Sequence, residues 1–85
     1  MYHVDIERRV FKELKSLHPK IQRQVRGKID ALADNPRPQD STKLHDVEGY
    51  RVTQGEYRIL YTIDDPARIV TVYRVKHRKE VYRNL

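Results

Sequence analysis

The spacing of apolar side chains changes twice in the first half of the chain, and each change predicts a new element. Residues 2–6 (YHVDI) alternate in the manner of a half-buried strand. From residue 7 the apolar positions recur every three or four residues, as on one face of an amphipathic helix. The first such stripe is Val10, Leu14 and Leu17, and the second is Ile21, Val25, Ile29 and Leu32. The pattern predicts two helices in antiparallel contact, with Pro19 at the first position of the second helix.

The second half of the chain has the composition and the two-residue period of strands. Residues 36–42 (PRPQDST) form a polar loop, and a short edge strand is predicted at residues 43–45. Further strands are predicted at 50–53, 57–63 and 69–75, the last of which is apolar on both faces and therefore central. We expect an α+β fold in which an N-terminal strand and a two-helix hairpin pack on a mostly antiparallel four- to five-stranded sheet, followed by a short C-terminal basic helix or tail.

The turn between two of these strands, Gln54-Gly55, is a candidate two-residue hairpin loop. The face expected to pack on the helices then carries Tyr50, Val52, Tyr57, Ile59, Tyr61 and Ile63. On the other face Arg51 lies directly opposite Arg58, and such like-charged pairs destabilise a sheet by about 0.2–1 kcal/mol. This arrangement favours a phosphate site, since arginine binds phosphate in a bidentate way. The alternatives are that both arginines are solvated and lean apart, or that Glu56 bridges them.

The net charge of the chain indicates which class of molecule it binds. The 85 residues carry a net charge of +6 with a pI near 9.8, and the excess is concentrated in residues 74–83. This balance indicates a polyanion, either nucleic acid or an acidic protein, although an ordinary charged surface is the alternative. The chain contains no cysteine and no apolar run long enough to span a membrane. We therefore expect one domain over residues 1–85, in the cytoplasm and without a membrane partner.

The basic tail contains the remaining candidate site residues. Cations for binding RNA or the ribosome are Arg74, Lys76, Lys79 and Arg83. Tyr82 beside them is suited to stacking on a base of single-stranded RNA. His77 is a candidate general acid or base, and a surface or backbone-bonded histidine is an equal alternative. The other histidines have no ligand spacing, and no phosphate-binding glycine loop is present, so neither a metal nor a cofactor is expected.

Two segments together, Tyr-Arg-Val…Gly-Glu-Tyr-Arg-Ile-Leu-Tyr (50–61) and His-Arg-Lys-Glu-Val-Tyr (77–82), resemble the RelE/ParE superfamily of bacterial toxins, and within it the RelE-type enzymes. The resemblance covers essentially the whole chain. It implies ribosome-dependent cleavage of mRNA in the A site without metal, by attack of the ribose 2′-hydroxyl on the adjacent phosphate. It also implies inhibition of translation and a cognate antitoxin in a hetero-oligomeric complex.

The resemblance also implies roles for individual residues. Arg58 matches the family's phosphate-contacting arginine, Arg78 the tail arginine proposed as an acid or charge stabiliser, and Tyr82 the tyrosine that orients the base. Arg51 stands where some relatives have a lysine implicated as general base, and Thr53 stands where they have a second lysine. Because arginine is not deprotonated in proteins, the group that removes the 2′-hydroxyl proton stays open: His77, since some relatives use a histidine, or the ribosome.

Two other functions compete with this reading. A ParE-like protein of the same fold would inhibit DNA gyrase without catalysis, and would tolerate substitution of Arg58 and Tyr82. A plain basic nucleic-acid-binding module would bind free nucleic acid in a salt-sensitive way and would not be toxic.

Overall fold

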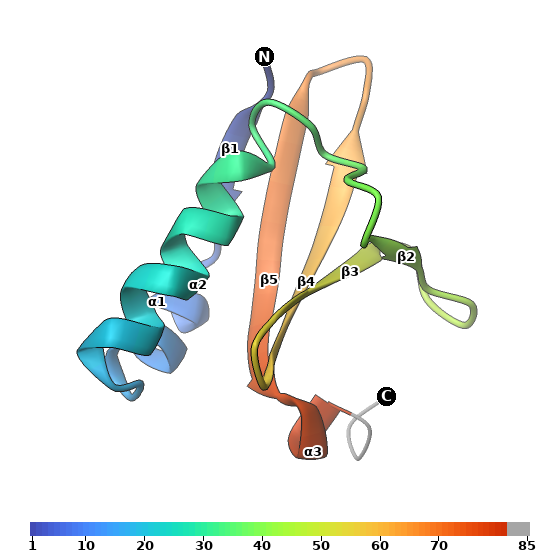
Figure 1. Ribbon diagram of the computed structural model, residues 1–85. Helices are drawn as coiled ribbons and strands as arrows, with labels where there is room; N and C mark the ends of the chain where they lie inside the picture. Colours follow the sequence, from blue (N-terminus) through green and yellow to red (C-terminus); the bar gives the residue numbers. More distant parts are fainter. Residues whose placement is uncertain (82–85) are drawn as a thin grey trace.

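The computed structural model describes residues 1–81, and it shows a five-stranded sheet with two helices on one face (Figure 1). The elements are β1 (His3–Ile6), α1 (Arg8–Lys15), α2 (Pro19–Ala31), β2 (Thr42–Lys43), β3 (Tyr50–Gln54), β4 (Tyr57–Asp64), β5 (Ile69–His77) and α3 (Arg78–Val81). The strand order is β1-β5-β4-β3-β2, in which β1 is parallel to β5 and the other pairs are antiparallel. This confirms the predicted α+β class, the helical hairpin and the short C-terminal helix.

Local chemistry fixes where the two long helices begin and end. The first ends at Lys15, and the next residue, Ser16, caps it: its hydroxyl donates to the carbonyl oxygen of Glu13 (2.7 Å). The second starts at Pro19, and the His18 ring accepts a hydrogen bond from the Lys20 N–H (3.2 Å), which caps that terminus. In the described part of the chain, no helix has the length and apolarity needed to cross a membrane.

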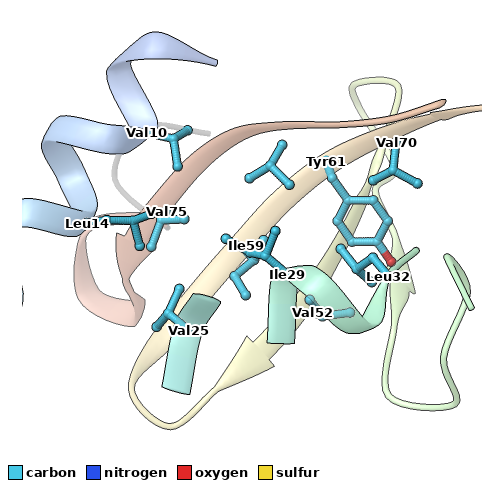
Figure 2. Close-up of a cluster of buried hydrophobic side chains, with 11 residues drawn as sticks. Val10, Leu14, Val25, Ile29, Leu32, Val52, Ile59, Tyr61, Val70 and Val75 are labelled. Carbon is cyan, nitrogen blue, oxygen red and sulfur yellow. The ribbon is translucent and has the colours of Figure 1, made fainter. Parts of the chain in front are cut away.

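The core lies between the helices and one face of the sheet, as Figure 2 shows. Its buried members from the helices and the residue after α2 are Val10, Leu14, Val25, Ile29 and Leu32, and those from the strands are Val52, Ile59, Tyr61, Val70, Val72 and Val75. The hairpin residues predicted to face the helices do so, because Tyr50, Tyr57 and Ile63 pack against the same cluster. Tyr61 is fully buried, and its hydroxyl donates to the carbonyl oxygen of Pro36 (2.7 Å), which ties the loop after α2 to the sheet.

The register of the β3–β4 hairpin differs from the predicted one by two residues. Arg58 lies opposite Thr53, and Arg51 lies opposite Leu60, so the predicted Arg51–Arg58 pair is wrong. The cause is the loop, which consists of Gly55 and the next residue. Gly55 has a φ of 59° and its successor does not share a positive φ, which is the type II′ arrangement with glycine first rather than second.

The edge strand is also shifted, to Thr42–Lys43 instead of residues 43–45. The chain leaves this strand because the Leu44 N–H donates to the carbonyl oxygen of Gly49 (3.0 Å) and closes a loop. Gly49 has a φ of 135°, and a Cβ there would lie 2.8 Å from the carbonyl oxygen of Tyr61. Only glycine allows the loop to approach β4 so closely.

Strand β1 covers only the first half of β5. Beyond Val72 the ladder with β4 contains a bulge, since consecutive residues of β4 face Val72 and Arg74 and leave Tyr73 between them. Side chains of α1 replace the missing strand here. Arg9 Nε donates to the Tyr73 carbonyl (2.8 Å), and the Val75 N–H donates to Glu13 Oε1 (2.9 Å).

Candidate functional site

The face of the sheet opposite the helices carries a cluster of cations near the β3–β4 hairpin. Strand alternation and the observed register place on it Arg51, Thr53, Arg58, Leu60, Arg74 and Lys76. We call these six residues the open-face cluster. The structure therefore brings together four of the predicted site residues on three neighbouring strands.

A like-charged pair does occur in this cluster, with a different partner from the predicted one. Arg58 lies directly across from Lys76 of β5. The Arg58 guanidinium is held at the hairpin, because Nη1 donates to the carbonyl oxygens of Gly55 (3.3 Å) and Tyr57 (3.2 Å). Two cations fixed in facing positions repel each other, and an anion placed between them would be stabilised by both.

Two carboxylates reach the β5 side of the cluster. Glu13 of α1 lies 3.2 Å from Lys76 Nζ and 3.5 Å from Arg74 Nε. Glu80 of α3 lies 3.7 Å from the same lysine amine, one helical turn along the chain. The lysine thus connects the first helix of the chain to the last.

Helix α3 is fixed to the tip of the hairpin, which positions the predicted tail cations. The Arg78 N–H donates to the Glu56 carbonyl (2.7 Å), and Arg78 Nη1 lies 3.6 Å from the Glu56 carboxylate. In Figure 1 the helix lies at the hairpin end of the sheet. The side chains of Arg78 and Lys79 are exposed at this end of the sheet. Tyr82 and Arg83, the other predicted tail residues, lie outside the described residues.

His77 lies at the end of β5, where it lines a small pocket of about 170 Å³ together with Lys76, Glu13 and Glu80. It pairs with Tyr57 on the helix-facing side of the sheet, where the two rings meet edge to face at 5.5 Å. Its Nδ1 accepts the Lys79 N–H (3.2 Å), and its Nε2 lies 4.0 Å from Glu56. The structure thus does not bring His77 onto the face of Arg58, and it gives the ring the backbone hydrogen bond of the alternative reading.

The far end of the same sheet face is acidic. A cavity of about 620 Å³ there is lined in part by Asp5, Glu48, Asp64 and Asp65. Carboxylates therefore gather at this far end, whereas the cations of the open-face cluster lie at the hairpin end. Among residues 1–81, no group of three or more histidine, aspartate or glutamate side chains is arranged to hold a metal ion.

Asp65 lies at this far end and links three parts of the fold. Arg37 donates from both terminal nitrogens to Asp65 (2.8 and 3.2 Å) and from Nε to the Tyr50 hydroxyl (3.1 Å). The Tyr2 hydroxyl donates to the same carboxylate (2.6 Å). The Arg37 hydrogen bonds, followed by that of Tyr2, lower the pKa of Asp65 to about 2.

Glu13 is the residue near this site that sequence reasoning missed. The sequence feature that could have indicated its role is its position beside Leu14, on the flank of the apolar stripe of α1. A charged residue on that flank usually points to solvent. Only the end of β1 at Ile6, which leaves the β5 edge open, shows why the carboxylate turns inward.

Comparison with known proteins agrees with this fold. A sequence model of the family described as "ParE toxin of type II toxin-antitoxin system, parDE" matches residues 4–82. The chain belongs to this family, the RelE/ParE toxins of type II toxin–antitoxin systems.

Two relatives of similar sequence carry the name RelE. The toxin RelE of Mycobacterium tuberculosis is 31% identical over 84 residues, which cover 96% of this chain and 87% of the relative. The structure is similar to that of the archaeal RelE–RelB complex from Pyrococcus horikoshii (TM-score 0.81, 29% identity, 91% of this chain and 94% of that chain). It is also similar to the toxin–antitoxin complex RelBE2 from Mycobacterium tuberculosis (TM-score 0.80, 28% identity, 89% and 96%).

Proposed function

We propose that this toxin is a metal-independent endoribonuclease that cleaves mRNA in the ribosomal A site and so inhibits translation in the cytoplasm. The observation that carries the proposal is the open-face cluster, in which Arg58 and Lys76 face each other across two strands. A fold selected for stability alone gains nothing from this repulsion. A phosphodiester bound between the two side chains turns the same repulsion into binding energy.

The reaction follows from what these groups do to a phosphate. Attack of the 2′-hydroxyl on the adjacent phosphorus builds negative charge on the phosphoryl oxygens, and the 5′-oxygen leaves with a proton. Arg58 and Arg51 stabilise that charge on the sheet, and Arg78 does so from α3. Tyr82 aligns the nucleotide by stacking. The reaction leaves a 2′,3′-cyclic phosphate and a 5′-hydroxyl end.

The proposal also covers the group that removes the 2′-hydroxyl proton. Because Arg51 and Thr53 cannot accept the 2′-hydroxyl proton and His77 faces the other side of the sheet, removal of this proton falls to the ribosome or to solvent. This agrees with an enzyme that works only on ribosomes. Arg74, Lys76, Lys79 and Arg83 then contribute charge for binding RNA rather than proton transfer.

The proposed protein partner is an acidic antitoxin. The structural relatives from P. horikoshii and M. tuberculosis were solved as complexes of a RelE toxin with its antitoxin. A hetero-oligomeric complex of the same kind would neutralise the cationic end of this sheet, and the net charge of +6 would speed the encounter with an acidic partner.

The proposal is tested by mapping the 5′ ends of an mRNA in a reconstituted translation reaction, with and without ribosomes. We expect new 5′-hydroxyl ends in the wild-type reaction only when ribosomes are present. Arg78→Ala should abolish most of them, because α3 loses the cation beside the hairpin. Cleavage by Arg78→Ala at the wild-type rate would remove Arg78 from the site.

The family description names ParE, so inhibition of gyrase is the second candidate function. The same wild-type protein distinguishes the two in a supercoiling assay with purified gyrase. Loss of supercoiling without any mRNA cleavage would replace the proposal with the gyrase inhibitor.

A further inference from the structure

Glu13 is an unusually placed carboxylate, because it reaches from α1 round the edge of the sheet to the cationic face. Its side chain is only 13% exposed. Oε1 accepts the Val75 N–H (2.9 Å) and completes the open edge of β5. Oε2 is fully buried, and no described residue donates a hydrogen bond to it, although Lys76 Nζ lies at 3.2 Å and Arg74 Nε at 3.5 Å.

The fold at this edge needs an oxygen acceptor but does not need a charge. The amide oxygen of a glutamine would accept the Val75 N–H equally well. A buried carboxylate instead has a desolvation cost, and an oxygen without a hydrogen bond adds to it. What the negative charge provides is attraction for two cations at the border of the open-face cluster.

Lys76 is the cation through which this charge can affect the site. It lies across from Arg58, which would otherwise repel it toward solvent. Glu13 on one side and Glu80 of α3 on the other hold its amine. The lysine side chain is 24% exposed, so most of its stem is packed while the amine stays at the surface.

We propose that Glu13 is a positioning residue: it holds Lys76 beside Arg58, so that two mutually repelling cations are arranged in advance for one phosphate. Glu13 itself does not touch RNA, because its free oxygen is buried. That the phosphate belongs to RNA rests on the proposed function, whereas the position of Lys76 is independent of it. Charge fixed in place before the substrate arrives is more effective than charge that must be reorganised during the reaction.

The variant Glu13→Gln separates charge from shape. It keeps the acceptor for the edge of β5 and removes only the attraction for the lysine. The matched control is Asp30→Asn, which makes the same change of charge at an exposed position of α2. Both variants are compared by thermal unfolding to establish that they are folded.

The first measurement is independent of activity. Lysine amines are labelled with limiting acetic anhydride, and labelled peptides are quantified by mass spectrometry. Lys28 is an internal reference, since it is paired with Asp40 (2.8 Å) and has 26% side-chain exposure, close to that of Lys76. We expect Glu13→Gln to increase labelling of Lys76 and to leave Lys28 unchanged, and Asp30→Asn to change neither. Unchanged labelling of Lys76 in Glu13→Gln would overturn the proposal.

The second measurement is cleavage of mRNA on ribosomes at varied concentration of programmed ribosome. For Glu13→Gln we expect kcat to fall by about 10- to 100-fold, because a small misplacement of a binding group has effects of this size. KM should be unchanged or lower, because a negative charge beside the cationic face is gone. In the folded protein, a general distortion of the site would raise KM as kcat falls, so a fall in kcat without a rise in KM marks the positioning role.

The outcomes separate the two proposals. If the wild type does not cleave RNA, the proposed function fails, and the labelling result alone decides whether Glu13 holds Lys76. If the wild type cleaves and Glu13→Gln has the kcat of Asp30→Asn, the positioning role is refuted. The variant Lys76→Met provides a further test, since adding Glu13→Gln to it should cause no further loss of kcat. This double variant removes both charges, so it remains informative if Glu13→Gln alone does not fold.

Discussion

Replacement of Arg58 by methionine tests whether its charge serves the site or the fold. Methionine keeps an unbranched apolar stem and removes the guanidinium. The variant loses two long hydrogen bonds from one nitrogen, to the Gly55 and Tyr57 carbonyls at 3.3 and 3.2 Å. Together these contribute about 0.5–1.5 kcal/mol to the free energy of unfolding.

The same change relieves the repulsion between Arg58 and Lys76, which lie directly opposite each other. A cross-strand pair of like charges costs about 0.2–1 kcal/mol, so the gain offsets most of the loss. We therefore expect the free energy of unfolding to change by no more than about 1 kcal/mol. In a domain of this size the melting temperature would then move by at most about 8 °C.

The effect on activity should be far larger. Loss of one donor to the charge that develops in a transition state lowers kcat by about 10²–10³-fold. Urea denaturation gives the stability, and cleavage of mRNA on purified ribosomes gives the rate. Arg23→Met is the control, because it makes the same change at an exposed position of α2. The reasoning is refuted if Arg58→Met cleaves as fast as this control, or if it loses more than about 2 kcal/mol of stability.

Other predictions concern the fold that holds the site. The Arg37 hydrogen bonds lower the pKa of Asp65 to about 2. The contribution of this carboxylate to stability is therefore present above its ordinary pKa of 3.8 and is lost as the pH falls toward 2. The melting temperature of Asp65→Asn should decline less over that pH interval than that of the wild type. Gly49→Ala should lower the free energy of unfolding, measured by urea denaturation, by more than about 1 kcal/mol, since its Cβ would meet the Tyr61 carbonyl at 2.8 Å. Gly27→Ala, in the exposed middle of α2, should raise it by about 0.5–1 kcal/mol in the same assay. Tyr61→Phe should lose about 1–2 kcal/mol in the same assay, because a buried carbonyl loses its donor, while cleavage by the folded fraction stays at the wild-type rate.

The faces of the hairpin were predictable even though its register was not. The predicted and observed registers differ by two residues, and a shift of two leaves every side chain on its original face. Tyr57, Ile59 and Tyr61 therefore pack on the helices as expected, while the partner of Arg58 across β3 is Thr53 instead of Arg51. The alternation of apolar and polar residues predicts which face of a strand is buried, whereas the register of the hairpin depends on the φ of a single loop residue.

The relation between Arg58 and Lys76 could not be predicted for a different reason. It depends on how β5 pairs with β4 across a turn, and a bulge at Tyr73 changes the alignment within that pair. The contact of Glu13 with β5 joins residues 62 positions apart in sequence. No local period carries information about such contacts, so the cations were identified from the sequence while their counterion was not.

The parallel pairing of β1 with β5 has a consequence for synthesis of the protein. The first strand of the chain finds its neighbour only when residues 69–72 have been made, and the site depends on residues that come later still. Because a polypeptide leaves the ribosome from its N-terminus, the sheet cannot close before the first half of β5 has emerged. The complete sheet therefore forms late, and a chain that stops before residue 69 lacks the neighbour of its first strand.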